Sequence, residues 1–263
     1  MSTTVRATID EYAFGRVFIA LAVIGSGLQQ AISGKFVRIV PALPTWVPAI
    51  SFWAVIIGIV LIVIGGALLA NRCLRLAAIC LAGLILLAVV FLHLPEIAAD
   101  PMHGFRWTNP LKALALFGGA LVIAGWAGAS AVTTSRNNNL IRTWAPRVLL
   151  AAFLVVCGLQ HFAYTDFAAQ LIPVWIPGHV AWTYFSGVAL ILGGVGLLVP
   201  ATSRWAALLS GVMILLWVFL LHLPRAFADL HQAGELSGVF EALALSGVAL
   251  VNAPFRSSAA PRV

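Results

Sequence analysis

Eight long apolar stretches alternate with short polar segments along the chain. They cover residues 14–32, 50–70, 74–94, 111–126, 148–163, 180–199, 205–223 and 239–251. An α-helix rises 1.5 Å per residue, so a segment of roughly 17 to 21 residues crosses a hydrocarbon core of about 30 Å. The pattern therefore predicts an all-α fold with eight transmembrane helices, of which the fourth and the eighth are the shortest.

The polar and aromatic positions follow the same order twice. Three short strings occur once in each half of the chain. Gly-Leu-Gln-Gln at 27–30 returns as Gly-Leu-Gln-His at 158–161. A Pro-x-Trp-x-Pro segment lies at 44–48 and 173–177, and His-Leu-Pro lies at 93–95 and 222–224. From Pro44 to Pro173 and from His93 to His222 the offset is 129 residues. Landmarks in register over a whole half predict a duplicated four-helix unit.

The duplication predicts how the chain is organised. Residues 1–130 form the first unit and residues 144–263 the second, joined by a polar cytoplasmic linker at 131–143. A unit with an even number of spans makes the next unit enter the membrane from the same side. The two repeats are then parallel, with a pseudo-two-fold axis along the membrane normal.

Composition agrees with a membrane protein, since 62% of the residues are hydrophobic and 9% charged, with a mean hydropathy of +1.05. Ten basic residues fall on one side of the predicted spans and five on the other, which predicts cytoplasmic N- and C-termini. The net charge of +7 then reflects membrane insertion. No basic patch with interleaved aromatic residues indicates a nucleic-acid partner, so the lipid bilayer is the expected one.

Polar residues inside transmembrane helices are costly and usually face the bundle interior. In the second unit such residues are predicted at the outer ends of three spans: His161, His222 and Glu241. We expect the three side chains to approach within about two hydrogen-bond lengths and to form an outward-facing pocket. The histidines would carry protons or contact a ligand, and Glu241 would set their charge. Under the alternative interpretation these groups only satisfy helix ends.

Four further residues complete the predicted ligand-binding set of the second unit: Gln160, Trp175, Trp182 and Arg225. Arg225 either pairs with Asp229 or meets an anionic group. Trp175, like Trp46 in the first unit, is either an anchor at the membrane surface or a lid over the polar residues, and Trp182 lines the same mouth in either case.

The first unit offers a second cluster at the same depth, made of Gln30, His93, Lys112, Trp46 and Trp53. Lys112 takes the place of Glu241 and so reverses the charge. We favour separate clusters for the two residues, because pseudo-symmetry brings equivalent residues together only near the axis. In the alternative interpretation both residues face the interface of the two units and neutralise each other. No His-x-x-His or Glu-x-x-His spacing supports a metal site, so no bound metal is predicted.

The strings at 158–162, 173–177, 182–185 and 217–225 resemble the DoxX-like family of small bacterial membrane proteins. The resemblance covers residues 147–253 best, and the first unit is a weaker copy. It implies a four-helix unit in a bacterial plasma membrane. Some members of the family look like membrane subunits of quinone-linked oxidoreductases, and others are involved in redox homeostasis or in binding lipid-like molecules.

The sequence favours a protein that binds a quinone or another lipophilic small molecule in the outward-facing pocket, as a membrane subunit of a redox-linked system. Quinone chemistry needs a hydrogen-bonding or proton-carrying group beside an apolar slot. The chain carries no flavin, haem or iron–sulfur motif, so a soluble or membrane redox partner would supply the electrons. A small-solute transporter and a membrane scaffold for a soluble enzyme stay open as alternatives, as does the question of catalysis.

Overall fold

The computed structural model describes residues 3–36, 43–44, 47–127, 144–228 and 233–253. Within these ranges the regular structure is helical, without strands, and eight segments are long and apolar enough to cross a membrane. They are Glu11–Ser33, Ile50–Leu69, Leu74–Ala99, Gly104–Ala127, Ala145–Ala163, His179–Leu198, Ser203–Ala228 and Gly234–Asn252. The predicted all-α membrane fold is confirmed. The predicted linker at 131–143 lies outside the described residues.

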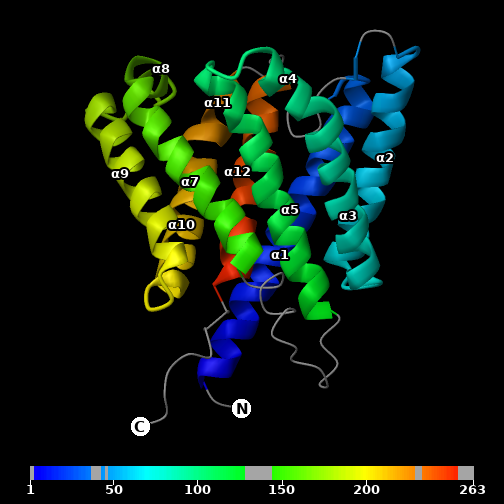
Figure 1. Cartoon of the computed structure of the whole chain (residues 1–263), viewed down its shortest axis with the longest axis horizontal. Coiled ribbons are helices and arrows are strands. Elements are labelled where there is room, and N and C mark those ends of the chain that lie inside the picture. The colour runs from blue at the N-terminus through cyan, green and yellow to red at the C-terminus, as the bar shows by residue number, and fades with distance from the viewer. Residues whose placement is uncertain (1–2, 37–42, 45–46, 128–143, 229–232, 254–263) are drawn as a thin grey trace.

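The long helices alternate in direction along the chain (Figure 1). They are α1 (Thr3–Ser33), α2 (Ile50–Leu69), α3 (Leu74–Ala88), α5 (Thr108–Ala127), α7 (Ala145–Ala163), α9 (His179–Leu198), α10 (Ser203–Trp217) and α12 (Ala233–Asn252). Both α1 and α7 begin at the end of the bundle where α5 and α12 finish. We call this the inner end, after the predicted topology, and the opposite one the outer end.

Short elements gather at the outer end (Figure 1). They are the π-helical turn η1 (Val89–His93) with α4 (Leu94–Ala99), the 3-10 turn η2 (Gly104–Trp107), α8 (Thr165–Gln170), and the π-helical turn η4 (Val218–His222) with α11 (Leu223–Ala228). Thus α3 continues through η1 into α4, and α10 continues through η4 into α11.

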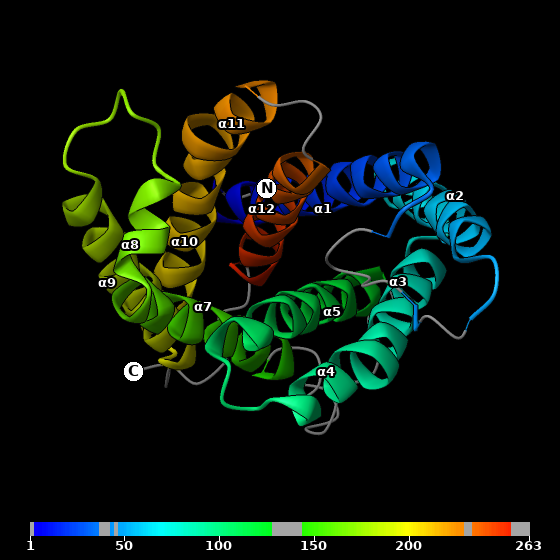
Figure 2. The same ribbon diagram turned by 90° about the horizontal axis from the view of Figure 1, so that it is seen from above.

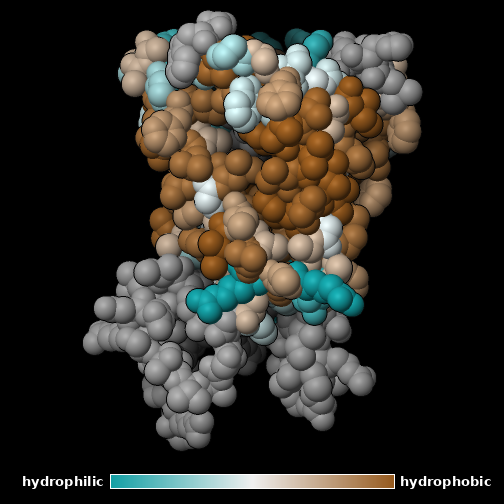
Figure 3. Space-filling model, turned by 90° about the vertical axis from the view of Figure 1, so that its right-hand side faces the viewer, coloured by the Kyte–Doolittle hydropathy of each residue, from teal (hydrophilic) through white to brown (hydrophobic). Residues whose placement is uncertain are grey.

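Apolar side chains cover the middle of the molecule, with hydrophilic groups at both ends of the face seen in Figure 3. Leu192, Leu209 and Val63 are each about two thirds exposed, at 65%, 65% and 66%. In water such a surface would be unfavourable, whereas lipid chains solvate it without cost. The protein is therefore an integral membrane protein that crosses the bilayer several times.

Four helices form a central row, in the order α1, α12, α5 and α7 (Figure 2). In this row α1 packs along α12, α12 along α5, and α5 along α7. The outer positions are taken by α2 beside α1, α3 beside α5, α9 beside α7, and α10 beside α12. The first helix of each predicted unit thus lies against the last helix of the other unit, so extensive contacts cross the predicted division of the chain.

Glycines allow the closest helix contacts. A Cβ atom on Gly27 would lie 2.6 Å from the carbonyl oxygen of Gly58, and one on Gly158 would lie 2.7 Å from that of Gly187. The first contact joins α1 to α2 and the second joins α7 to α9. Small residues at these positions let the backbones approach, which is how helices associate in lipid. The glycines of the second contact follow those of the first at the offsets of the sequence repeat, 131 residues for Gly27 and Gly158 and 129 for Gly58 and Gly187.

The π-helical turns explain how a proline is accommodated near the end of α3 and of α10. Proline has no N–H group and crowds the carbonyl four residues earlier. The helix widens instead, and the N–H of Leu94 reaches the carbonyl of Val89, while that of Leu223 reaches the carbonyl of Val218. Each turn ends at a histidine, so it changes the face on which that side chain leaves the helix.

The fourth and eighth spans are longer than the apolar pattern predicts. α5 begins at Thr108 rather than 111, and α12 begins at Ala233 rather than 239. Polar residues lie near these helix starts, and Thr108 and Ser237 among them form hydrogen bonds to neighbouring helices. Hydropathy alone places such residues outside a span, although their side chains have partners inside the bundle.

The topology predicts opposite labelling of the two ends. Cysteine placed at Ala201, in the inner turn between α9 and α10, should react with a membrane-impermeant thiol reagent only from the cytoplasm. Cysteine placed at Asp166, in α8, should react only from outside, because the charged reagent does not cross the lipid bilayer. The background would have Cys73, Cys80 and Cys157 replaced. Labelling of both positions from one face would contradict the topology.

Candidate functional site

A buried ion pair lies at the centre of the bundle. The Nζ atom of Lys112, on α5, donates a hydrogen bond to Oε2 of Glu241, on α12, at 2.6 Å. The lysine side chain is 19% exposed and the glutamate side chain 5%. Glu241 lies eight residues after the start of α12 and Lys112 four residues after the start of α5, about 12 Å and 6 Å along the helices, so the pair lies within the membrane-spanning segments and nearer to their outer end.

The pair corrects our expectation that Lys112 and Glu241 serve separate clusters. The two residues are 129 positions apart, which is the offset of the sequence repeat. Equivalent positions can touch only where the two units meet, and α5 and α12 are adjacent in the central row. The opposite charges suit this contact, because like charges would repel each other there.

Two more hydrogen bonds lie one helical turn nearer the outer end. Thr108 of α5 donates to the side-chain oxygen of Gln160 on α7 at 3.0 Å, and Ser237 of α12 donates to that of Gln29 on α1 at 3.2 Å. Thr108 stands four residues before Lys112, and Ser237 four before Glu241, so each hydroxyl lies on the same helix face as its charged neighbour. We call the six residues Gln29, Thr108, Lys112, Gln160, Ser237 and Glu241 the polar layer.

The polar layer spans the whole central row of helices, from α1 through α12 and α5 to α7. Gln160 was predicted as a ligand contact, whereas Gln29, Thr108 and Ser237 were not predicted. The repeat contained a signal for all three, since Gln29 corresponds to Gln160 and Thr108 to Ser237. Their pairing with each other across the units depends on the helix arrangement.

One oxygen of the buried carboxylate is left over. Glu241 as a residue is 4% exposed, and its Oε1 atom has no hydrogen-bond partner within the described part of the chain. A buried carboxylate oxygen without a donor is unfavourable by several kcal/mol unless water or a ligand supplies one. The layer therefore offers an acceptor for a group that is not part of these helices.

His222 lies next to the layer. Its imidazole Nδ1 would be 3.0 Å from a Cβ atom on Gly238, so the ring packs against the α12 backbone at a glycine. Gly238 is three residues before Glu241, which puts the histidine and the carboxylate on one face of α12, one turn apart. The η4 turn produces this placement, and the absence of a side chain at 238 makes room for the ring.

His161 has its described contacts away from the ion pair. Its Nδ1 donates to the carbonyl oxygen of Cys157 in the preceding turn at 2.7 Å, and its ring stacks on Trp217 of α10 with centroids 6.3 Å apart. It is partly buried between α7, α9 and α10. The predicted close approach of His161, His222 and Glu241 stays a prediction.

Gln30 and His93 of the first unit are more buried than their counterparts His161 and His222. Gln30 is fully buried and donates from Nε2 to the carbonyl oxygen of Ala54 on α2 at 3.0 Å. His93, at the end of η1, is 1% exposed. Trp53 is 42% exposed and meets Phe52 edge-on. Trp46 lies outside the described residues.

Three residues predicted as ligand contacts lie at the periphery. The guanidinium of Arg225 on α11 forms an ion pair with Glu235 on α12, which ties the outer end of α11 to the bundle. The alternative partner Asp229 is outside the described residues. Trp175 and Trp182 are 61% and 50% exposed. Exposure of this extent is typical of tryptophans that anchor a protein at the membrane surface.

The described residues contain no group of three or more histidine, cysteine, aspartate or glutamate side chains placed to hold a metal ion. The polar layer offers hydrogen-bonding and charged groups: an ammonium group with further N–H donors, a carboxylate with one unpaired oxygen, and an imidazole one turn away.

The family model described as a domain of unknown function (DUF8561) matches residues 150–235. No curated protein and no solved structure matches the chain. The matched region runs from α7 to the first turn of α12, and it includes Gln160, His161 and His222 but ends before Glu241.

Proposed function

We propose that the protein binds a small lipophilic molecule through the polar layer, with Glu241 and Lys112 as the groups that hold its polar end. The observation that carries this proposal is the unused Oε1 atom of Glu241, in a residue that is 4% exposed. Apolar helices surround the pair, so a ligand with an apolar body and a single polar end matches these surroundings.

The ion pair has hydrogen-bonding capacity of both kinds. The ammonium group of Lys112 has three N–H donors, of which Glu241 takes one. The carboxylate accepts that bond on Oε2 and keeps Oε1 for a donor. A quinone carbonyl would accept from Lys112, and the hydroxyl of the corresponding quinol would donate to Glu241. A quinone/quinol couple is therefore our preferred ligand, and it agrees with the resemblance to DoxX-like proteins.

We further infer that the protein belongs to a redox-linked membrane system, as a tandem DoxX-like protein in a bacterial plasma membrane with both termini in the cytoplasm. The charge bias of the loops supports this orientation. Electron transfer would depend on a partner protein, whereas this chain would bind and orient the lipophilic molecule. His222, one turn from Glu241, is the group best placed to exchange a proton with it.

Ligand retention in a neutral double variant tests the proposal. Lys112→Met combined with Glu241→Met removes both charges together and leaves neither partner buried alone. In native mass spectrometry of gently solubilised protein we expect the wild type to carry a non-phospholipid small molecule and the double variant to lose it. A short-chain benzoquinone should also raise the melting temperature of the wild type but not of the double variant.

The matched control is Asp100→Asn, which removes the carboxylate of the exposed Arg106–Asp100 pair at the outer end. We expect this variant to retain the molecule and the quinone response. Equal ligand retention by the wild type and the Lys112/Glu241 double variant would exclude the polar layer as the binding site. If the wild type retains a molecule but its melting temperature does not rise with the benzoquinone, the ligand is not a quinone, although the polar layer stays the binding site.

A further inference from the structure

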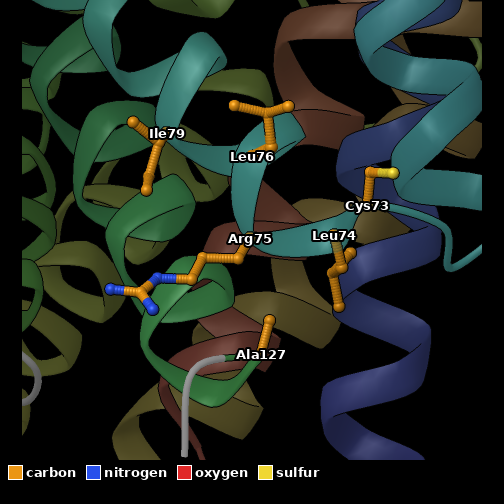
Figure 4. Close-up of a pocket in the computed structure, with 6 residues that line it drawn as sticks. All are labelled: Cys73, Leu74, Arg75, Leu76, Ile79 and Ala127. Atoms are coloured by element: carbon orange, nitrogen blue, oxygen red, sulfur yellow. The ribbon is translucent and has the colours of Figure 1, made fainter.

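A second feature with binding chemistry lies at the inner end, far from the polar layer along the helices. A cleft of about 510 Å³ opens beside the start of α3 (Figure 4). Its walls come from the first residues of α3 and from the end of α5, and they consist of Cys73, Leu74, Arg75, Leu76, Ile79 and Ala127. Arg75 is the charged residue among them.

Arg75 forms no ion pair within the described ranges, although the matching residue of the second unit does. The repeat offset of 129 relates Arg75 to Arg204, which stands at the start of α10. Arg204 forms an ion pair with Glu11 of α1 at 2.6 Å, and both side chains are largely buried, at 24% and 15% exposure. Arg204 is thus neutralised by a residue of the same chain, whereas Arg75 lies in an open cleft.

The remaining wall of the cleft is apolar and faces outward. Leu76 is 63% exposed and Ile79 48%, and both belong to the apolar surface that the bilayer covers. In Figure 4 the guanidinium group of Arg75 extends toward the same side of α3 as Ile79. A cation at the level of the headgroups is therefore continuous with a surface at the level of the acyl chains.

We propose that this cleft binds an anionic phospholipid of the inner leaflet, with the phosphate on the Arg75 guanidinium and an acyl chain along Leu76 and Ile79. Guanidinium groups bind phosphate oxygens in a bidentate manner. Basic pockets at the cytoplasmic ends of transmembrane helices suit lipid headgroups for the same reason. A soluble phosphate would satisfy Arg75 but leave the apolar wall without a partner. The lipid site is independent of the proposed function of the polar layer.

The test compares two arginines of the same turn. Arg72 is exposed three residues before Arg75 and does not line the cleft. The proteins are reconstituted in nanodiscs that contain equal amounts of phosphatidylglycerol and phosphatidylcholine, and the lipids retained after release are counted by native mass spectrometry. We expect Arg75→Gln to lower the phosphatidylglycerol preference about tenfold through loss of the charged hydrogen bonds. Arg72→Gln should lower it only about twofold, through the screened surface potential.

Two further arms complete the experiment. Arg75→Lys keeps the charge but not the bidentate geometry, so its preference should fall between those of the wild type and Arg75→Gln. Inorganic phosphate at millimolar concentration should leave lipid retention unchanged. Equal losses in Arg72→Gln and Arg75→Gln would overturn the proposal in favour of a general surface charge. Displacement of the lipid by inorganic phosphate would overturn it in favour of a free-anion site.

Discussion

Replacing Glu241 by Gln should destabilise the protein by about 3 kcal/mol, because Lys112 then keeps its charge inside the bundle without a counter-ion. Lys112→Met alone should cost a similar amount, since it leaves the carboxylate buried with neither oxygen paired. Both effects can be measured by thermal unfolding in one detergent, followed by circular dichroism of the helices or by the height of the main peak in size-exclusion chromatography after heating.

The double variant Lys112→Met/Glu241→Gln provides the decisive comparison. The double variant should be more stable than the Glu241→Gln protein, because the second substitution removes the isolated ammonium group. The coupling between the two sites is then large, as expected for residues in direct contact. Strictly additive losses would contradict the 2.6 Å contact and return Lys112 and Glu241 to separate clusters. Asp100→Asn serves as the control for loss of an exposed pair and should change stability by less than about 1 kcal/mol.

Gly58→Ala should destabilise the protein by about 1 to 3 kcal/mol, whereas Gly66→Ala on the same helix should be tolerated or slightly stabilising. A Cβ atom at 58 would lie 2.8 Å from the carbonyl oxygen of Gly27 and 2.9 Å from the backbone nitrogen of Ala31, so α1 and α2 would have to separate. A Cβ atom at 66 meets nothing within 4 Å. The same thermal unfolding assay measures the difference.

The second copy of this contact provides an independent check. A Cβ atom at Gly187 would lie 2.8 Å from the ring of Phe162 and 3.1 Å from the carbonyl oxygen of Gly158. We expect Gly187→Ala to be destabilising too, but less than Gly58→Ala, because an aromatic ring moves more easily than a helix backbone. A stability of Gly58→Ala equal to that of Gly66→Ala would show that α1 and α2 do not approach as closely as described.

The hydropathy pattern predicted the eight membrane-spanning helices. A helix in lipid forms all its backbone hydrogen bonds within one segment, so each span can be recognised as a local run of apolar residues. The starts of α5 and α12 were misplaced because hydropathy is a local property and does not include hydrogen-bond partners on other helices. By hydropathy alone Thr108 and Ser237 would be assigned to loops. Their hydrogen bonds to Gln160 and Gln29 make them compatible with a membrane-spanning helix.

The candidate site was predicted in part. Gln160, Lys112, Glu241 and His222 were recognised as costly polar residues in apolar surroundings, which is a property of the sequence. Their grouping was not predicted correctly: Lys112 and Glu241 were assigned to separate clusters, and Arg225 was considered with Asp229 although it pairs with Glu235. Partner choice of this kind depends on which helices are neighbours.

The sequence by itself determined the helical character, the membrane location and the order of the polar landmarks, since each depends on residue types within one segment. Only the tertiary structure decided that α1 lies along α12 and α5 along α7, and hence that residues of different halves form the polar layer. Lipid is as apolar as the helix surfaces, so hydrophobicity does not select neighbours there. Close contacts between small residues and hydrogen bonds between buried polar groups make that selection, and both require the helices to be placed in three dimensions.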